Sequence, residues 1–156
     1  MSMSSSAAAG STAPDRSALH VDIEAATGFL RGHPRAVLAT VRSDGRPQLS
    51  PVVAAVDDDA RVLISTRETA VKARNLARNP LASLCVLSDG FFGEWAQLEG
   101  TAELIYLPAA LGLLEDYYRR ISGEHPDWPE YREAMRRDRR LIARITVARA
   151  GPTVSG

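Results

Sequence analysis

The sequence predicts a closed or half-closed antiparallel β-barrel with flanking helices. Six short apolar runs have the length of strands, and several are joined by residues that favour tight turns. Only four segments show helical spacing, and they do not alternate regularly with the strands, which argues against a doubly wound parallel sheet. A barrel is the expected arrangement, because closure of the sheet protects the edges of short antiparallel strands.

The first elements expected are a helix and a β-hairpin. Val21–Arg31 carries apolar residues at helical spacing and stops at Gly32-His33-Pro34. Arg35–Arg42 and Gln48–Val56 are strand-like runs, and the Asp44-Gly45 pair between them predicts the turn of a hairpin.

A third strand and a second helix follow the acidic turn Asp57-Asp58-Asp59. Arg61–Ser65 is apolar at three consecutive positions, as in a strand, and Thr69–Asn79 has helical character and ends at Pro80. We expect the acidic triplet to be a solvated hairpin tip rather than a pair of catalytic carboxylates.

The second half of the chain adds strands and helices in an irregular order. Asp127-Trp128-Pro129-Glu130 is a helix-start signal, with proline in the first turn. Gly100 is expected to break the longest strand. The elements expected here are strands over Leu81–Ser88, Trp95–Tyr106 and Leu141–Ala148, and helices over Pro108–Ser122 and Asp127–Arg137.

Length and composition limit the domain organisation and the class of partner. The 156 residues suit one domain, expected over residues 18–150, between a disordered Ser/Ala-rich tail at 1–17 and a flexible C-terminus at 151–156. Nineteen basic and nineteen acidic residues cancel, so no nucleic-acid or membrane partner is expected. The tail lacks the regions of a secretory signal, and the single Cys85, expected to be a small buried residue, fits a reducing compartment. We therefore expect a cytoplasmic protein.

Several familiar site types have no support in the sequence. The glycine-rich patterns of Rossmann and P-loop nucleotide sites and the G-x-S-x-G nucleophile elbow are absent. His20, His33 and His125 are scattered without the spacing of metal ligands, so no metal site built by the protein is expected.

Cations crowd the expected start of the helix that follows Arg61–Ser65. Positive charge is unfavourable there, because the N-terminus of a helix carries a partial positive charge of its own. Helical side chains tilt toward the N-terminus, so Lys72 reaches back toward Thr66 and Thr69, either of which is a candidate N-cap. These groups form a site suited to phosphate. The cations are Arg67, Lys72 and Arg74, beside the single carboxylate of Glu68.

The alternative is an ordinary amphipathic helix with a solvated charged face. Ala73, Leu76 and Ala77 supply a core face for such a helix. Charge alone leaves both interpretations open.

The segment Val62–Thr66, followed by Lys72–Leu84, resembles the phosphate-binding strand–helix–strand of the pyridoxamine-phosphate-oxidase-like split-barrel superfamily. Leu76 lies four residues after Lys72, and Asn79-Pro80 lies seven and eight residues after it, as in that superfamily. Further segments are most similar to its actinobacterial branch (FDOR-B type), which uses the 5-deazaflavin coenzyme F420. These segments are Val37–Thr40, Asp44–Ser50, Leu98–Ala102 and Asp127–Met135.

The resemblance implies a six-stranded antiparallel split β-barrel with flanking helices, and a homodimer with cofactors at the subunit interface. The implied cofactor is F420, with FMN as the alternative. The loop Phe91–Trp95 is implied to approach the substrate face of the cofactor from the second subunit. The implied cofactor-binding residues are Lys72 and Thr66 at the phosphate, Ser65 and Asn75 shaping that pocket, and Gln48, Ser50, Pro51 and Val52 alongside the ring.

The superfamily often carries a second cation two residues before the lysine, where this chain has Ala70. Arg67 or Arg74 is the expected replacement.

The resemblance also implies the activity. We expect an F420-dependent oxidoreductase that transfers a hydride between the deazaflavin and a small conjugated substrate, with no catalytic side chain assigned. An FMN-dependent oxidase or reductase and a non-catalytic flavin-binding protein are the alternatives. Oxidation of vitamin B6 is disfavoured, because the Arg-Leu-x-Pro segment of the true pyridoxamine-phosphate oxidases is missing.

Overall fold

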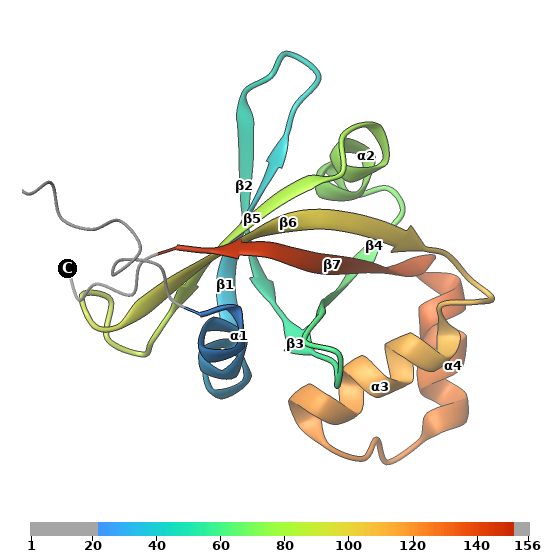
Figure 1. The fold of residues 1–156 in the computed structure, drawn as a ribbon. Coiled ribbons are helices and arrows are strands. Elements are labelled where there is room, and N and C mark those ends of the chain that lie inside the picture. Colours follow the sequence, from blue (N-terminus) through green and yellow to red (C-terminus); the bar gives the residue numbers. More distant parts are fainter. Residues whose placement is uncertain (1–21, 152–156) are drawn as a thin grey trace, which may run out of the picture.

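A computed structural model of the protein describes residues 22–151, which form a curled antiparallel sheet with helices around it (Figure 1). The tail predicted at 1–17 and the predicted C-terminal segment beyond residue 151 lie outside the described residues. The helices are α1 (Ile23–Gly32), α2 (Val71–Arg78), α3 (Leu111–Ser122) and α4 (Trp128–Arg137); the strands are β1 (Arg35–Val41), β2 (Pro47–Val53), β3 (Ala55–Val56), β4 (Val62–Arg67), β5 (Leu81–Leu87), β6 (Trp95–Ile105) and β7 (Arg140–Ala150).

The seven strands follow the order β2-β1-β5-β6-β7-β4-β3, and every pair is antiparallel. Strands β2 and β3 are separated only by Ala54, yet they lie at opposite ends of this order. The sheet therefore curls back on itself into a half-barrel, which confirms the predicted split-barrel class.

The predicted strand Gln48–Val56 is divided in two, which gives seven strands where six were expected. Ala54 is buried at the corner, and its amide donates a hydrogen bond to the carbonyl of Pro34 at 2.8 Å. This bond turns the chain from the β1 side of the barrel to the β4 side.

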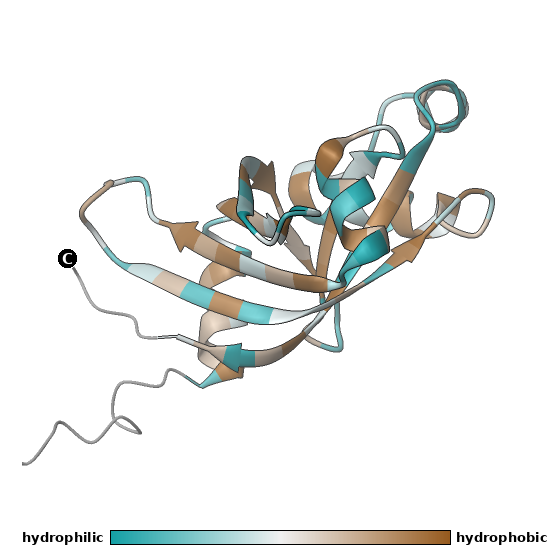
Figure 2. Cartoon of the chain, turned by 90° about the horizontal axis from the view of Figure 1, so that it is seen from above, coloured by the Kyte–Doolittle hydropathy of each residue, from teal (hydrophilic) through white to brown (hydrophobic). Residues whose placement is uncertain are grey.

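The position of the core explains why burial alternates along some strands and why β4 has three consecutive buried residues. In β1 and β5, buried residues alternate with half-buried ones, so one face of each strand packs inward. Val62, Leu63 and Ile64 of β4 are all buried, because Val62 and Ile64 face the barrel interior while Leu63 packs under α3 and α4. Bands of hydrophobic and hydrophilic residues alternate along the long strands (Figure 2).

Two predictions about local structure have opposite outcomes. Helix α4 begins as predicted, with Asp127 accepting a hydrogen bond from the amide of Glu130 at 3.1 Å. The predicted break at Gly100 is wrong, because β6 runs continuously from Trp95 to Ile105. A register shift between Glu99 and Gly100 absorbs the irregularity as a bulge.

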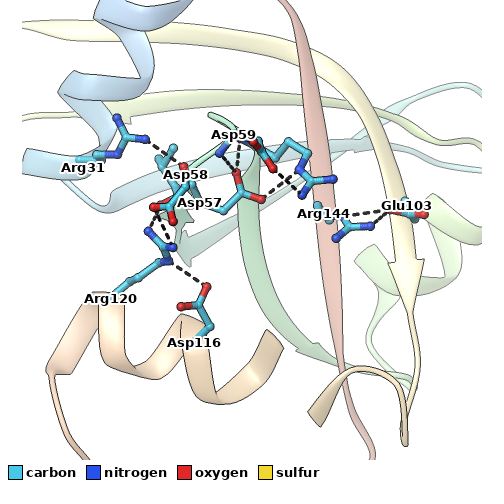
Figure 3. Close-up of polar contacts among 10 residues, drawn as sticks. Arg31, Asp57, Asp58, Asp59, Glu103, Asp116, Arg120 and Arg144 are labelled. Atoms are coloured by element: carbon cyan, nitrogen blue, oxygen red, sulfur yellow. Dashed lines mark hydrogen bonds and ion pairs between the residues drawn. The ribbon is translucent and has the colours of Figure 1, made fainter. Parts of the chain in front are cut away.

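The acidic turn is the tip of the β3–β4 hairpin, and Asp58 and Asp59 are exposed there as predicted, but Asp57 is not solvated. Asp57 is buried, and its carboxylate accepts hydrogen bonds from the amides of Asp59 and Arg61 and from Arg61 Nε. Arg120 of α3 reaches the same turn and contacts Asp58 at 3.1 Å (Figure 3). The acids thus satisfy turn donors and tie α3 to the connection between β3 and β4.

Candidate functional site

The barrel is open between β2 and β4, and this split is the candidate site. Strand β3 pairs with β4 only at Ala55–Leu63 and Val56–Val62, so no strand among residues 22–151 covers that edge of β4 beyond Leu63. The edge of β2 that faces away from β1 is likewise unpaired within the described residues. The two edges diverge from the corner at Ala54 (Figure 1). Their backbone amides and carbonyls are available to a ligand.

Tyr117 of α3 closes one end of this opening. Its hydroxyl donates a hydrogen bond to the carbonyl of Val53 at 2.9 Å. Burial raises the pKa of Tyr117, while the positive charge of Arg140 acts to lower it. The phenol therefore stays protonated near neutral pH and keeps its role as donor.

A cleft of about 330 Å³ lies where β4 ends and α2 begins. Four of the predicted cofactor-binding residues meet there, since Ser65, Thr66, Arg67 and Lys72 all line it. The remaining lining residues are Thr69, Ala70 and Arg140.

The start of α2 differs from the sequence prediction. Thr66 and Arg67 pair with Leu141 and Arg140 of β7, so β4 continues past the expected N-cap position. Helix α2 begins at Val71, and its N-cap is Ala70, which makes no side-chain capping bond. The prediction that Thr66 or Thr69 caps the helix is therefore wrong. An N-cap without a side-chain acceptor leaves first-turn amides for an anion in the cleft.

Some of the charged side chains around the cleft form ion pairs and others do not. Arg67 lies 3.7 Å from Asp138, and Arg139 lies 2.9 Å from Glu68. Lys72 and Arg140 form no ion pair with any residue between 22 and 151. The cleft therefore carries net positive charge, which suits an anionic group.

Gln48 and Asn75 lie in a separate hydrogen-bond network. Thr40 Oγ1 donates to Gln48 Oε1 at 3.2 Å and accepts from Asn75 Nδ2 at 3.0 Å. Arg78 donates to Asn75 Oδ1 at 2.8 Å. Both polar groups of the buried Asn75 side chain are thus used, and Asn75 anchors α2 on β1 rather than lining the cleft.

The predicted residues of β2 lie on its two faces. Ser50 is opposite Leu38 of β1, and its buried Oγ has no hydrogen-bond partner among the described residues. Pro51 and Val52 border a second, smaller cleft of about 280 Å³ with Val53. An unpartnered hydroxyl on the strand that borders the split is a group that a bound ligand could satisfy.

The aromatic loop lies at the other end of the molecule from the anion cleft. Phe91 and Phe92 are 73% and 78% exposed. Their loop adjoins the Ala150 end of β7, whereas the cleft lies at the Arg140 end. A strand of 11 residues spans about 35 Å, so the loop does not reach the cleft of its own chain.

Arg140 is the site residue that the sequence did not reveal. It contributes to the cleft because β7 pairs with β4 so that Arg140 lies opposite Arg67. The only local signal was the run Asp138-Arg139-Arg140, which does not disclose that register.

Residues 23–152 match a family model described as pyridoxamine 5'-phosphate oxidase. The chain belongs to this family. Its members bind flavins such as FMN, and the split with its anion cleft fits that chemistry. The residues present fit a phosphate-bearing flavin, because Lys72 and Arg140 both line the cleft without an ion-pair partner among residues 22–151, and the buried Nε of Arg140 has no hydrogen-bond partner there.

Solved structures share the fold. The conserved hypothetical protein Rv2991 from Mycobacterium tuberculosis is 28% identical, with a TM-score of 0.69 and coverage of 85% of each chain. An F420 reductase is 22% identical, with a TM-score of 0.61, covering 80% of this chain and 94% of its own. The heme storage protein HutZ from Vibrio cholerae is 17% identical, with a TM-score of 0.63 and coverage of 83% and 92%. The last two identities are low enough to show the fold alone.

Two other kinds of site receive no support. Within residues 22–151, no three His, Cys, Asp or Glu side chains gather as metal ligands. In the same part of the chain, no helix has the length and apolarity needed to cross a membrane.

Proposed function

We propose that the protein is an F420-dependent oxidoreductase that transfers a hydride between the deazaflavin and a small conjugated organic substrate. The observation that carries the proposal is the positively charged cleft at Lys72, placed at one end of the split between β2 and β4. Family membership supports a flavin-type ligand, and the resemblance of Asp44–Ser50 and Asp127–Met135 to the F420-using branch favours the deazaflavin.

The residues of the chain bind and orient the cofactor. Lys72 holds the phosphate, and the first-turn amides of α2 and the hydroxyl of Thr66 lie beside it. The unpaired edge of β2, including Ser50, offers backbone groups along the ring. When bound, the deazaflavin supplies a hydride, which is the hard part of the chemistry.

We assign the accompanying proton to solvent. Among the described residues that line the anion cleft and the cleft at Pro51, none is a carboxylic acid. The open split admits water to the edge of the ring. The protein then accelerates the reaction by positioning the two reactants.

A second copy of the chain completes the site in this proposal. The outer face of β2, β1 and β5 exposes large apolar side chains, with Leu49 at 62% and Leu81 at 55%. We expect pairing through this face to bring the partner's aromatic loop toward the cleft, which the chain's own Phe91 and Phe92 do not reach. Light scattering is expected to give twice the 16.9 kDa of one chain, and a monomer with bound cofactor would contradict the shared site.

The activity is tested by single-turnover mixing of the protein with reduced F420 and a panel of cyclic enones. We expect oxidation of the cofactor that depends on the protein and reaches one equivalent of hydride per bound deazaflavin. Binding of F420 without any such oxidation across the panel would favour a non-catalytic carrier.

FMN is the second candidate, favoured by the family match itself. Flavin and deazaflavin have clearly different absorbance spectra, so the chromophore that binds during titration distinguishes them. Tight binding of FMN with no measurable affinity for F420 would replace the proposed activity by a flavin oxidase or reductase.

A further inference from the structure

We infer that Arg140 is the second cation of the anion site, and that Lys72 and Arg140 hold the cofactor phosphate together. This inference rests on the proposed function, because the phosphate belongs to the flavin or deazaflavin. It replaces the expectation that Arg67 or Arg74 fills the role left open by Ala70.

The positions of Lys72 and Arg140 support this assignment. Lys72 comes from α2 and Arg140 from the first position of β7, yet both line the same cleft. The β4–β7 register fixes this arrangement by pairing Arg140 with Arg67. Two cations on different elements approach an anion from different directions, which the lysine alone does not achieve.

The surroundings of Arg140 support the same assignment. The Nε atom of Arg140 is buried and forms no hydrogen bond within residues 22–151. The nearby acids are already engaged, since Asp138 contacts Arg67 and Glu115 contacts Arg132. Tyr117 and Tyr131, which face Arg140 from α3 and α4, are neutral phenols, and burial raises the pKa of Tyr131 to about 12. A buried guanidinium N–H without an acceptor is unfavourable, and a phosphate oxygen relieves that penalty.

The two arginines that the sequence suggested are less suited to this role than Arg140. Arg67 is paired with Asp138, and its side chain is 56% exposed. Arg74 is exposed on α2 and does not line the cleft.

The role of Arg140 implies a ligand with a phosphate. A guanidinium binds two oxygens of one phosphate at once, whereas an ammonium acts as a point charge. Riboflavin has the ring without the phosphate, so its dissociation constant should not depend on Arg140. The affinity for inorganic phosphate should depend on Arg140 even when no ring is bound.

The test compares Arg140→Gln with Arg140→Lys and with the control Arg139→Gln, whose side chain is held by Glu68 outside the cleft. For FMN or F420, whichever binds, Arg140→Gln should raise the dissociation constant about 10- to 100-fold, with Arg140→Lys intermediate. Arg139→Gln should leave it within about twofold. Circular dichroism and melting curves confirm that each variant is folded.

The probes separate this inference from the proposed function. Thermal stabilisation by inorganic phosphate should be present in the wild type and lost in Arg140→Gln. Loss of phosphate stabilisation in Arg140→Gln, with no binding of FMN or F420 by the wild type, would support the anion site and overturn the proposed cofactor. Unchanged cofactor and phosphate binding in folded Arg140→Gln, or an equal loss of riboflavin binding, would overturn the role of Arg140 alone.

Discussion

Replacing Lys72 by alanine is expected to weaken cofactor binding by about 2–3 kcal/mol, which corresponds to a 30- to 150-fold rise in the dissociation constant. Lys72 lines the anion cleft and has no ion-pair partner among the described residues, so its charge is free to meet a phosphate. The measurement is a fluorescence or absorbance titration of the wild-type and variant proteins with F420 and with FMN.

Arg74→Ala is the matched control for this experiment. Arg74 lies on the same short helix, two residues beyond Lys72, but it is exposed and does not line the cleft. Its removal changes the net charge by the same amount and should alter the dissociation constant less than about twofold. Equal effects of the two variants would mean that Lys72 acts only through general electrostatics. If neither variant changed the dissociation constant, the phosphate would not bind in this cleft.

Gly100→Ala is expected to destabilise the fold by about 3 kcal/mol or more. A Cβ atom on Gly100 would lie 2.0 Å from the carbonyl oxygen of Thr146 and 3.1 Å from the side chain of Ile145. The atom in the way belongs to the backbone of the paired strand β7. Moving a side chain therefore cannot make room, and the bulge in β6 has to rearrange. Urea denaturation followed by circular dichroism measures the loss.

Gly28→Ala separates this steric effect from the general effect of replacing glycine. Gly28 lies inside α1, and a Cβ atom there meets nothing within 4 Å among the described residues. Alanine favours a helix by about 1 kcal/mol over glycine, so this variant should be more stable than the wild type. Similar losses of stability in Gly28→Ala and Gly100→Ala would contradict the specific role of Gly100.

Much of the fold could be predicted because its signals are local. The alternating burial of β1 and β5, the hairpin at Asp44-Gly45 and the start of α4 at Asp127 follow from neighbouring residues. The strand limits beside the cleft could not be predicted in this way. Thr66 has the chemistry of an N-cap, but pairing with Leu141 extends β4 through it.

The site was predictable only where it is continuous in the sequence. Ser65, Thr66, Arg67 and Lys72 are close along the chain, and the structure brings them to one cleft. Arg140 is distant in sequence, and its place depends on a strand register that the sequence does not display. The same limit applies to Asp57, since its burial results from contacts made when the turn meets α1 and α3.

Hydrogen exchange of the protein with and without saturating cofactor tests most directly the claim that the cofactor lies in the split with its phosphate at the cleft. We expect slower exchange in residues 48–53 of β2 and residues 65–72 around the cleft, because bound ligand covers their unpaired backbone groups. Helix α4, at residues 128–137, serves as the internal reference and should exchange unchanged. Demonstrated binding with no protection in either of the first two segments would contradict the account.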